Sequence, residues 1–130
     1  MQHKNTVSLW AGNAAGPEVL EKFITPTYSA DGDEILSDFA KQFGMPQWDE
    51  DFREARHVLH ASRSVDRLLK GFSYDHLVIP KFVQVLGESF PMDVNALVLL
   101  YNFKHNGAIG QESVGAVELK FMGTIEIDVR

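Results

Sequence analysis

The alternation of apolar and polar side chains predicts a β-strand near the start of the chain. In residues 6–11, Val7 and Leu9 point to one side of the strand. Ser8 and Trp10 point to the other side. A Gly-Asn pair follows and ends the extended run, because both residue types tolerate the backbone angles of a turn.

Three further runs near the C-terminus are also strand-like. Residues 95–103 are densely apolar and end before an Asn-Gly pair of the kind found in hairpin turns. Residues 114–122 alternate as the expected partner strand, and Gly123 permits a bend before residues 124–129 alternate again. We therefore expect a C-terminal meander.

Helical spacing of apolar residues dominates the middle of the chain. A helix is expected to begin at Pro17, whose missing N–H does no harm in a first turn, and to end before Pro26. Leu20, Phe23 and Ile24 share one apolar face of this helix. The element is therefore expected to pack that face against a sheet.

Three more helices are expected further along. The first covers residues 37–43, and the second begins at Ser64, a good N-cap. The third covers residues 74–86 and contains Pro80, which should kink or restart it. Residues 56–60 fit either a strand or a helix, and we favour a short strand because they carry a β-branched valine and no clear cap.

These elements predict one α+β domain over residues 1–130. The N-terminal strand and the C-terminal meander should form a mostly antiparallel sheet, with the helices packed on one face.

The chain is 45% hydrophobic, which is enough for a packed core. It contains no cysteine, which excludes disulfides, thiolate metal sites and a cysteine nucleophile. The longest apolar run, residues 96–101, is too short for a signal peptide or a membrane span, so we expect a soluble cytoplasmic protein.

The negative charge is concentrated in the first half of the chain. Residues 1–54 contain four basic and ten acidic residues, whereas residues 55–130 contain eight of each. The net charge of −6 therefore belongs to the first 54 residues. Because an acidic surface repels phosphate backbones and anionic lipids, we expect no nucleic-acid or membrane partner. A cationic protein partner is favoured, although mild acidity also serves solubility alone.

Two segments concentrate these acids. Asp31 and Asp33 lie in an Asp-Gly-Asp-Glu run that superficially suggests calcium, but the twelfth position of the loop is Gln42 instead of glutamate. We interpret this run as a solvated turn. Residues 48–52 place three consecutive acids between two aromatic residues. The aromatic rings fit an interface, where such residues act as anchors, or a core with the acids facing water.

Glu54, His57 and His60 are the candidates for chemistry. Their spacing of three would align them on a helix as a metal site, whereas a strand points the two histidines to opposite faces. We expect no metal and no cofactor. The chain contains no Gly-x-Ser-x-Gly nucleophile motif and no glycine-rich phosphate loop. One alternative is a small enzyme or ligand-binding domain with a pocket between helices and sheet, using His57 or His60 as acid–base group.

Five short motifs are spread along the chain: VSLWAGN at residues 7–13, FGM at 43–45, DEDF at 49–52, LLxGxSY at 68–74 and LKFMGTI at 119–125. Together they resemble the immunity protein 22 family of bacterial polymorphic toxin systems. The resemblance covers nearly the whole chain. It implies an α+β fold and a non-enzymatic role in binding and neutralising a cognate toxin. It implies no catalytic residues and does not name the toxin.

Charge and aromatic clustering, and not the resemblance, suggest where such a toxin would bind. A nuclease toxin would have a basic surface, so acidic residues would speed its association. The candidate residues are five acids for steering and two tryptophans as anchors: Asp31, Asp33, Asp49, Glu50, Asp51, Trp10 and Trp48. A regulatory adaptor would show the same features.

Overall fold

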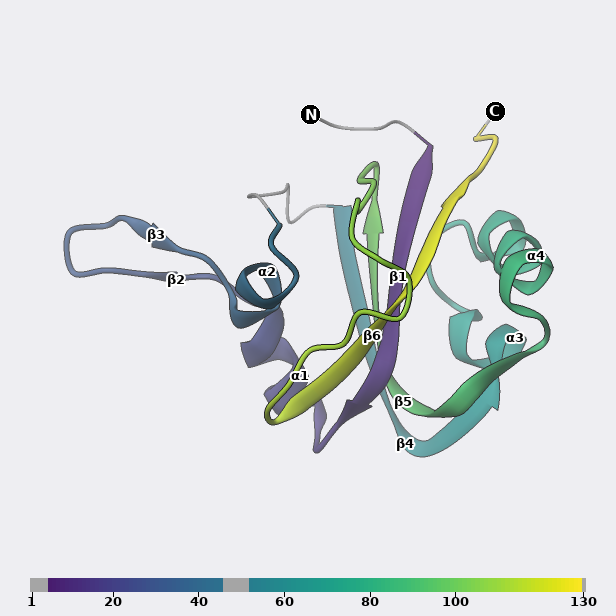
Figure 1. The fold of residues 1–130 in the computed structure, drawn as a ribbon, viewed down its shortest axis with the longest axis horizontal. Coiled ribbons are helices and arrows are strands. Elements are labelled where there is room, and N and C mark those ends of the chain that lie inside the picture. Colours follow the sequence, from purple (N-terminus) through teal and green to yellow (C-terminus); the bar gives the residue numbers. More distant parts are fainter. Residues whose placement is uncertain (1–4, 46–51, 130) are drawn as a thin grey trace.

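The computed structural model describes residues 5–45 and 52–129, and a four-stranded antiparallel sheet forms its centre (Figure 1). The sheet order is β4-β5-β1-β6. Its strands are β1 (Thr6–Ala14), β4 (Arg53–Ser64), β5 (Ser89–Tyr101) and β6 (Val117–Glu126). The predicted α+β class and the mostly antiparallel sheet are therefore confirmed.

Helices cover both faces of this sheet, which corrects the prediction of a single covered face. The helices α1 (Pro17–Ile24) and α2 (Asp38–Gln42) lie on one side of it. The helices α3 (Val65–Leu69) and α4 (Asp75–Leu86) lie on the other (Figure 1). The domain therefore has three layers in its described part.

The reason is that the two central strands are apolar on both sides. Leu9 of β1 belongs to the buried cluster that contains Leu68 and Phe82 of α3 and α4. Its neighbour Trp10 points to the opposite cluster, where Phe39 of α2 packs. A sheet with two apolar faces must bury both of them. The dense apolar composition of β5 carries the same signal in the sequence.

The strand order also differs from the expected meander. β1 lies between β5 and β6, with Trp10 paired to Val98 on one side and to Phe121 on the other. The segment between β5 and β6 is consequently a crossing loop and not a tight hairpin. β6 is one strand where two were expected, and Gly123 (φ 127°) lies beside its register shift. The expected bend is thus a bulge within a continuous strand.

The expected helices are found close to their predicted positions. The hydroxyl of Ser37 accepts the N–H of Ala40, and that of Ser64 accepts the N–H of Arg67, so both serines cap helices. α4 continues through Pro80 without a restart. Residues 56–60 lie within β4, which confirms the preferred strand.

A short hairpin connects α1 to α2 and projects from the body of the domain (Figure 1). It consists of β2 (Thr27–Tyr28) and β3 (Glu34–Ile35), and we call residues 27–36 the arm. The Asp-Gly-Asp-Glu turn predicted from the sequence forms its tip and the start of β3. None of the helices in the described ranges is long and apolar enough to cross a membrane.

Candidate functional site

The structure separates the residues that the sequence suggested for partner binding. Asp31 and Asp33 are exposed on the arm. Trp10 is 0% exposed. The remaining candidates, Trp48, Asp49, Glu50 and Asp51, lie outside the described residues.

Trp10 is a core residue. Its ring packs edge-on against Phe39 at 4.9 Å between centroids and lies 5.1 Å from the ring of Phe121. Trp10 therefore lies in the core beneath the helices, and not at an interface as the sequence had suggested. A fully buried side chain offers no surface to a partner, so Trp10 acts here through stability.

The arm presents its acids to solvent on a closed tip. Ser29 N–H donates to the carbonyl of Asp33 at 2.8 Å, and Gly32 N–H donates to the carbonyl of Ser29 at 2.9 Å. The Ser29 hydroxyl accepts the N–H of Asp33 at 3.1 Å. These bonds hold Asp31 and Asp33 at the end of the hairpin.

Apolar side chains accompany the acids of the arm. Tyr28 is 65% exposed, and Ile35 and Leu36 are exposed as well. The arm contains Glu34 as a third acid and no Lys or Arg. Exposed aromatic and aliphatic groups beside charge of one sign are typical of a surface that binds a partner.

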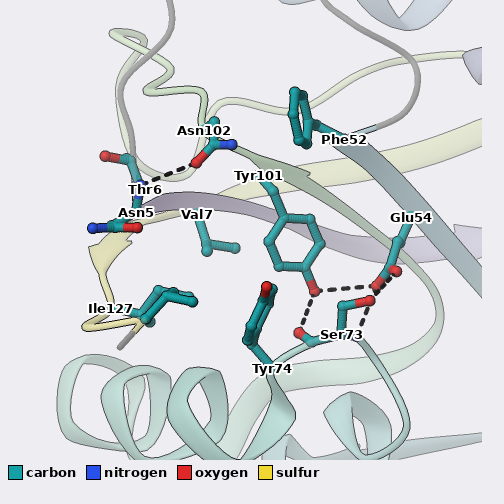
Figure 2. A pocket seen from close by; sticks show the side chains of 11 residues that line it. Asn5, Thr6, Val7, Phe52, Glu54, Ser73, Tyr74, Tyr101, Asn102 and Ile127 are labelled. Carbon is teal, nitrogen blue, oxygen red and sulfur yellow. Dashed lines mark hydrogen bonds between the residues drawn. The ribbon is translucent and has the colours of Figure 1, made fainter.

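A pocket of about 250 Å³ lies where β1 begins and β5 ends. The first residues of β4 and the loop between α3 and α4 complete it (Figure 2). Its lining combines three aromatic rings with polar groups and a single carboxylate: Asn5, Thr6, Val7, Phe52, Glu54, Ser73, Tyr74, Tyr101, Asn102, Ile127 and Val129.

Glu54 is the centre of a hydrogen-bond network in this pocket. Its Oε1 accepts the N–H of Ser73 at 2.9 Å, and its Oε2 accepts the Ser73 hydroxyl at 2.5 Å. The Tyr101 hydroxyl lies 3.1 Å from Glu54 Oε1 and 2.7 Å from the carbonyl oxygen of Ser73. One phenolic proton therefore faces two acceptors, and the network has more acceptors than protons.

The electrostatic surroundings of the network are negative. Burial raises the pKa of Tyr101, and the carboxylates of Glu54 and Asp75 raise it further. The backbone N–H of Gly71 donates to Asp75 at 2.8 Å and holds the pKa of that carboxyl below its usual value. Tyr101 thus stays protonated beside two carboxylates.

Unusual backbone conformations gather at the same pocket. Within the described residues, the non-glycine residues with positive φ are Asn5, Tyr74 and Asn102, and all three line it. Asparagine adopts this conformation readily, whereas a bulky tyrosine at φ 59° costs about 1–2 kcal/mol. Tyr74 is also 47% exposed, so core packing offsets only part of that cost. Such strain is typical of functional positions.

The two histidines suggested for chemistry lie elsewhere. His57 Nε2 is 3.2 Å from the carbonyl oxygen of Ala14, and His60 is exposed on β4. Neither of them lines the pocket. Across the described ranges, no group of three or more His, Asp or Glu side chains is arranged to hold a metal ion.

Most of the pocket residues were missed by reading the sequence. Glu54 was considered for a metal, and the roles of Ser73, Tyr74 and Tyr101 follow only from the folded chain. A signal for part of the pocket was present, because Ser73 and Tyr74 end one of the motifs that resemble the immunity protein family.

An α+β domain with a projecting acidic arm and a small pocket has the features of a protein-binding module. A family model described as Immunity protein 22 matches residues 7–128. The match covers almost the whole chain, so the chain belongs to this family. Membership assigns it a general role in toxin neutralisation. Neither a curated protein nor a solved structure matches the chain.

Proposed function

We propose that the protein is a non-enzymatic inhibitor that neutralises a cognate bacterial toxin with a basic surface, such as a nuclease. The observation that carries this proposal is the arm, on which Asp31 and Asp33 are exposed beside Tyr28. Its long-range field would draw in a cationic partner, and its apolar side chains would be covered on contact. We place this inhibition in the cytoplasm, where a nuclease would meet its substrate.

The acids outside the described residues support the same proposal through their sequence. Asp49, Glu50 and Asp51 add three negative charges to the half of the chain that carries the arm. We propose that they take part in steering and that Trp48 beside them is an anchor. Nucleic acid and membranes stay unfavoured as partners because the same charges repel both.

Co-expression tests this function directly. The toxin to use is the one encoded by the gene adjacent to that of this protein, produced in a bacterial host with and without the protein in excess. We expect growth only when the protein is present, with a stable complex of the two on gel filtration. A toxin that still kills cells holding a molar excess of folded protein would contradict the proposal.

A catalytic explanation of protection can be separated in the same experiment. An inhibitor that binds protects in proportion to its amount, so protection should end when the toxin exceeds it. An enzyme that destroyed the toxin would protect at amounts far below that of the toxin, and toxin recovered from the mixture would be chemically altered. Intact, active toxin recovered from the complex is the expected result.

A further inference from the structure

The hydrogen-bond network around Glu54 in this pocket has more acceptors than donors. Glu54, the Ser73 carbonyl and the Tyr101 oxygen together offer more lone pairs than the neighbouring protons can fill. A ligand that brings donors and positive charge would complete this network. A ligand that brings acceptors or negative charge would be repelled by Glu54 and by Asp75 nearby.

The walls of the pocket suit a flat cation. The rings of Phe52, Tyr74 and Tyr101 line the pocket together with Glu54 (Figure 2). Aromatic faces attract cations, and a guanidinium both stacks on a ring and donates to a carboxylate in the plane of its fork. The ammonium group of a lysine can bind the carboxylate as a point charge, but it cannot stack on a ring.

Among the described residues that line this space, none has a cationic side chain. Two arginines flank Glu54 on β4, Arg53 directly before it and Arg56 two residues after it, and both are engaged elsewhere. Arg53 Nη1 donates to the carbonyl oxygen of Ile24 at 2.7 Å. Arg56 Nη1 donates to the carbonyl oxygens of Leu68 and Lys70 at 2.8 and 2.6 Å. Its guanidinium lies 4.4 Å from the ring centroid of Phe72. Arg56 is thus bound at the end of α3. Glu54 is left accessible to an arginine of another protein.

The size of the pocket also limits the ligand. Sites for drug-sized molecules measure about 300–1,000 Å³, whereas this pocket measures about 250 Å³. That volume suits one long side chain better than a whole cofactor. The geometry points to an arginine side chain of the toxin as the occupant, inserted between the aromatic rings and bound to Glu54. This inference rests on the proposed function, because it assigns the pocket to the same partner.

A capped amino acid tests the pocket without the toxin. N-acetyl-arginine methylamide is titrated into the ¹⁵N-labelled full chain at neutral pH, and backbone amide shifts are followed. Saturable shifts are expected at Ser73, Tyr74 and Asn102, with a midpoint on the order of 1–10 mM for so small a ligand. Absence of saturable shifts at these three amides would overturn the inference.

Two further ligands define what the pocket recognises. N-acetyl-citrulline methylamide has the shape of the arginine ligand without its charge, and we expect it to bind at least tenfold more weakly. Equal binding of the two would overturn the role of Glu54. N-acetyl-lysine methylamide should bind severalfold more weakly than arginine, and equal or tighter binding of lysine would overturn the assignment to a guanidinium.

Variants locate the binding on the protein. Glu54→Gln should weaken arginine binding at least fivefold, and Tyr74→Asn should weaken it severalfold by removing a ring while keeping a residue that tolerates positive φ. Glu118→Gln, at the opposite end of β6, is the matched control and should leave binding unchanged. If Glu54→Gln fails to fold, Tyr74→Asn and the citrulline comparison still decide the question.

The two proposals fail in different ways. Loss of protection in the co-expression experiment would contradict the proposed function, whatever the capped arginine does. Arginine that fails to bind the folded protein, while the toxin is still neutralised, would remove the pocket from the interface and leave the function in place.

Discussion

The arm and the pocket are built in opposite ways. The arm is one continuous stretch of chain, mostly exposed, whose charge acts through solvent. The pocket is assembled from β1, β4, β5 and the loop before α4, and its polar groups are bonded to one another. Charge in solvent acts over about 8–10 Å, whereas hydrogen bonds and ring stacking act only at contact. The arm should therefore govern how fast a partner arrives, and the pocket how long it stays.

Charge reversal on the arm should give the largest change. Replacing Asp31, Asp33 and Glu34 together by Lys reverses the field that a basic toxin meets on approach. At low salt we expect association to slow by about 100-fold, and dissociation to change far less. Stopped-flow mixing at two salt concentrations measures both rates, and raising the salt should shrink the difference from the unmodified protein.

A matched variant separates the arm from net charge. Replacing Glu88, Glu118 and Glu126 by Lys makes the same change in net charge at three exposed acids away from the arm. We expect this variant to slow association much less. Equal slowing by the two variants would show that total charge steers the toxin and would remove the distinction between the regions.

Glu54→Gln should have the complementary effect on the complex. Because Glu54 would bind a cation at contact, its neutral replacement should speed dissociation by about tenfold or more and leave association nearly unchanged. Both rates can be measured by passing the variant over surface-immobilised toxin and following its association and dissociation. A variant that slowed association and kept the original lifetime would assign the pocket to steering and would break the comparison.

Tyr74→Asn should uncouple stability from binding. Asparagine accepts a positive φ and caps helices well, so the change should raise the free energy of unfolding by about 1 kcal/mol. The same change removes a ring from the pocket. Urea titration measures the stability, and toxin dissociation measures the binding. A loss of stability would show that packing of the Tyr74 ring stabilises the fold by more than its positive φ destabilises it.

Acidic pH should lower the stability of the core on the side of α1 and α2. His105 is 8% exposed, contacts the rings of Phe43 and Phe121, and has its pKa lowered by burial. Because the unfolded chain takes up the proton near pH 6.5, the stability is complete above that pH. It then falls as the pH drops towards the lower folded-state pKa. Urea titrations between pH 7.5 and 5 should show this loss, and His105→Gln should remove the His105 component of it.

The elements of the fold could be predicted because their signals are local. Ser37 and Ser64 mark helix starts through hydrogen bonds to residues three positions away. The order of the strands could not be predicted, since it depends on pairings such as Trp10 with Val98 and with Phe121. A dense apolar run such as β5 is typical of a strand buried on both faces, a signal that the prediction of a single helical layer did not use.

The same distinction applies to the candidate site. Asp31 and Asp33 could be found from the sequence because an exposed acidic turn is a property of neighbouring residues. Glu54 and Tyr101 meet only because β4 pairs with β5, and Ser73 reaches them from the loop before α4. Trp10 was predicted as an anchor and is a core residue, because an aromatic residue in a strand has the same local pattern in a core and at an interface.

The central place of β1 has a consequence for the life of the protein in the cell. Among the four strands of the sheet it is synthesised first, yet both of its neighbours come from the second half of residues 1–130, and Thr6 pairs with Glu126. Long-range pairing of this kind slows folding, because distant segments lose conformational entropy before their contacts can form. A nascent chain on the ribosome cannot complete its sheet until the last strand has emerged. If the protein neutralises a toxin, its protection begins with the finished molecule.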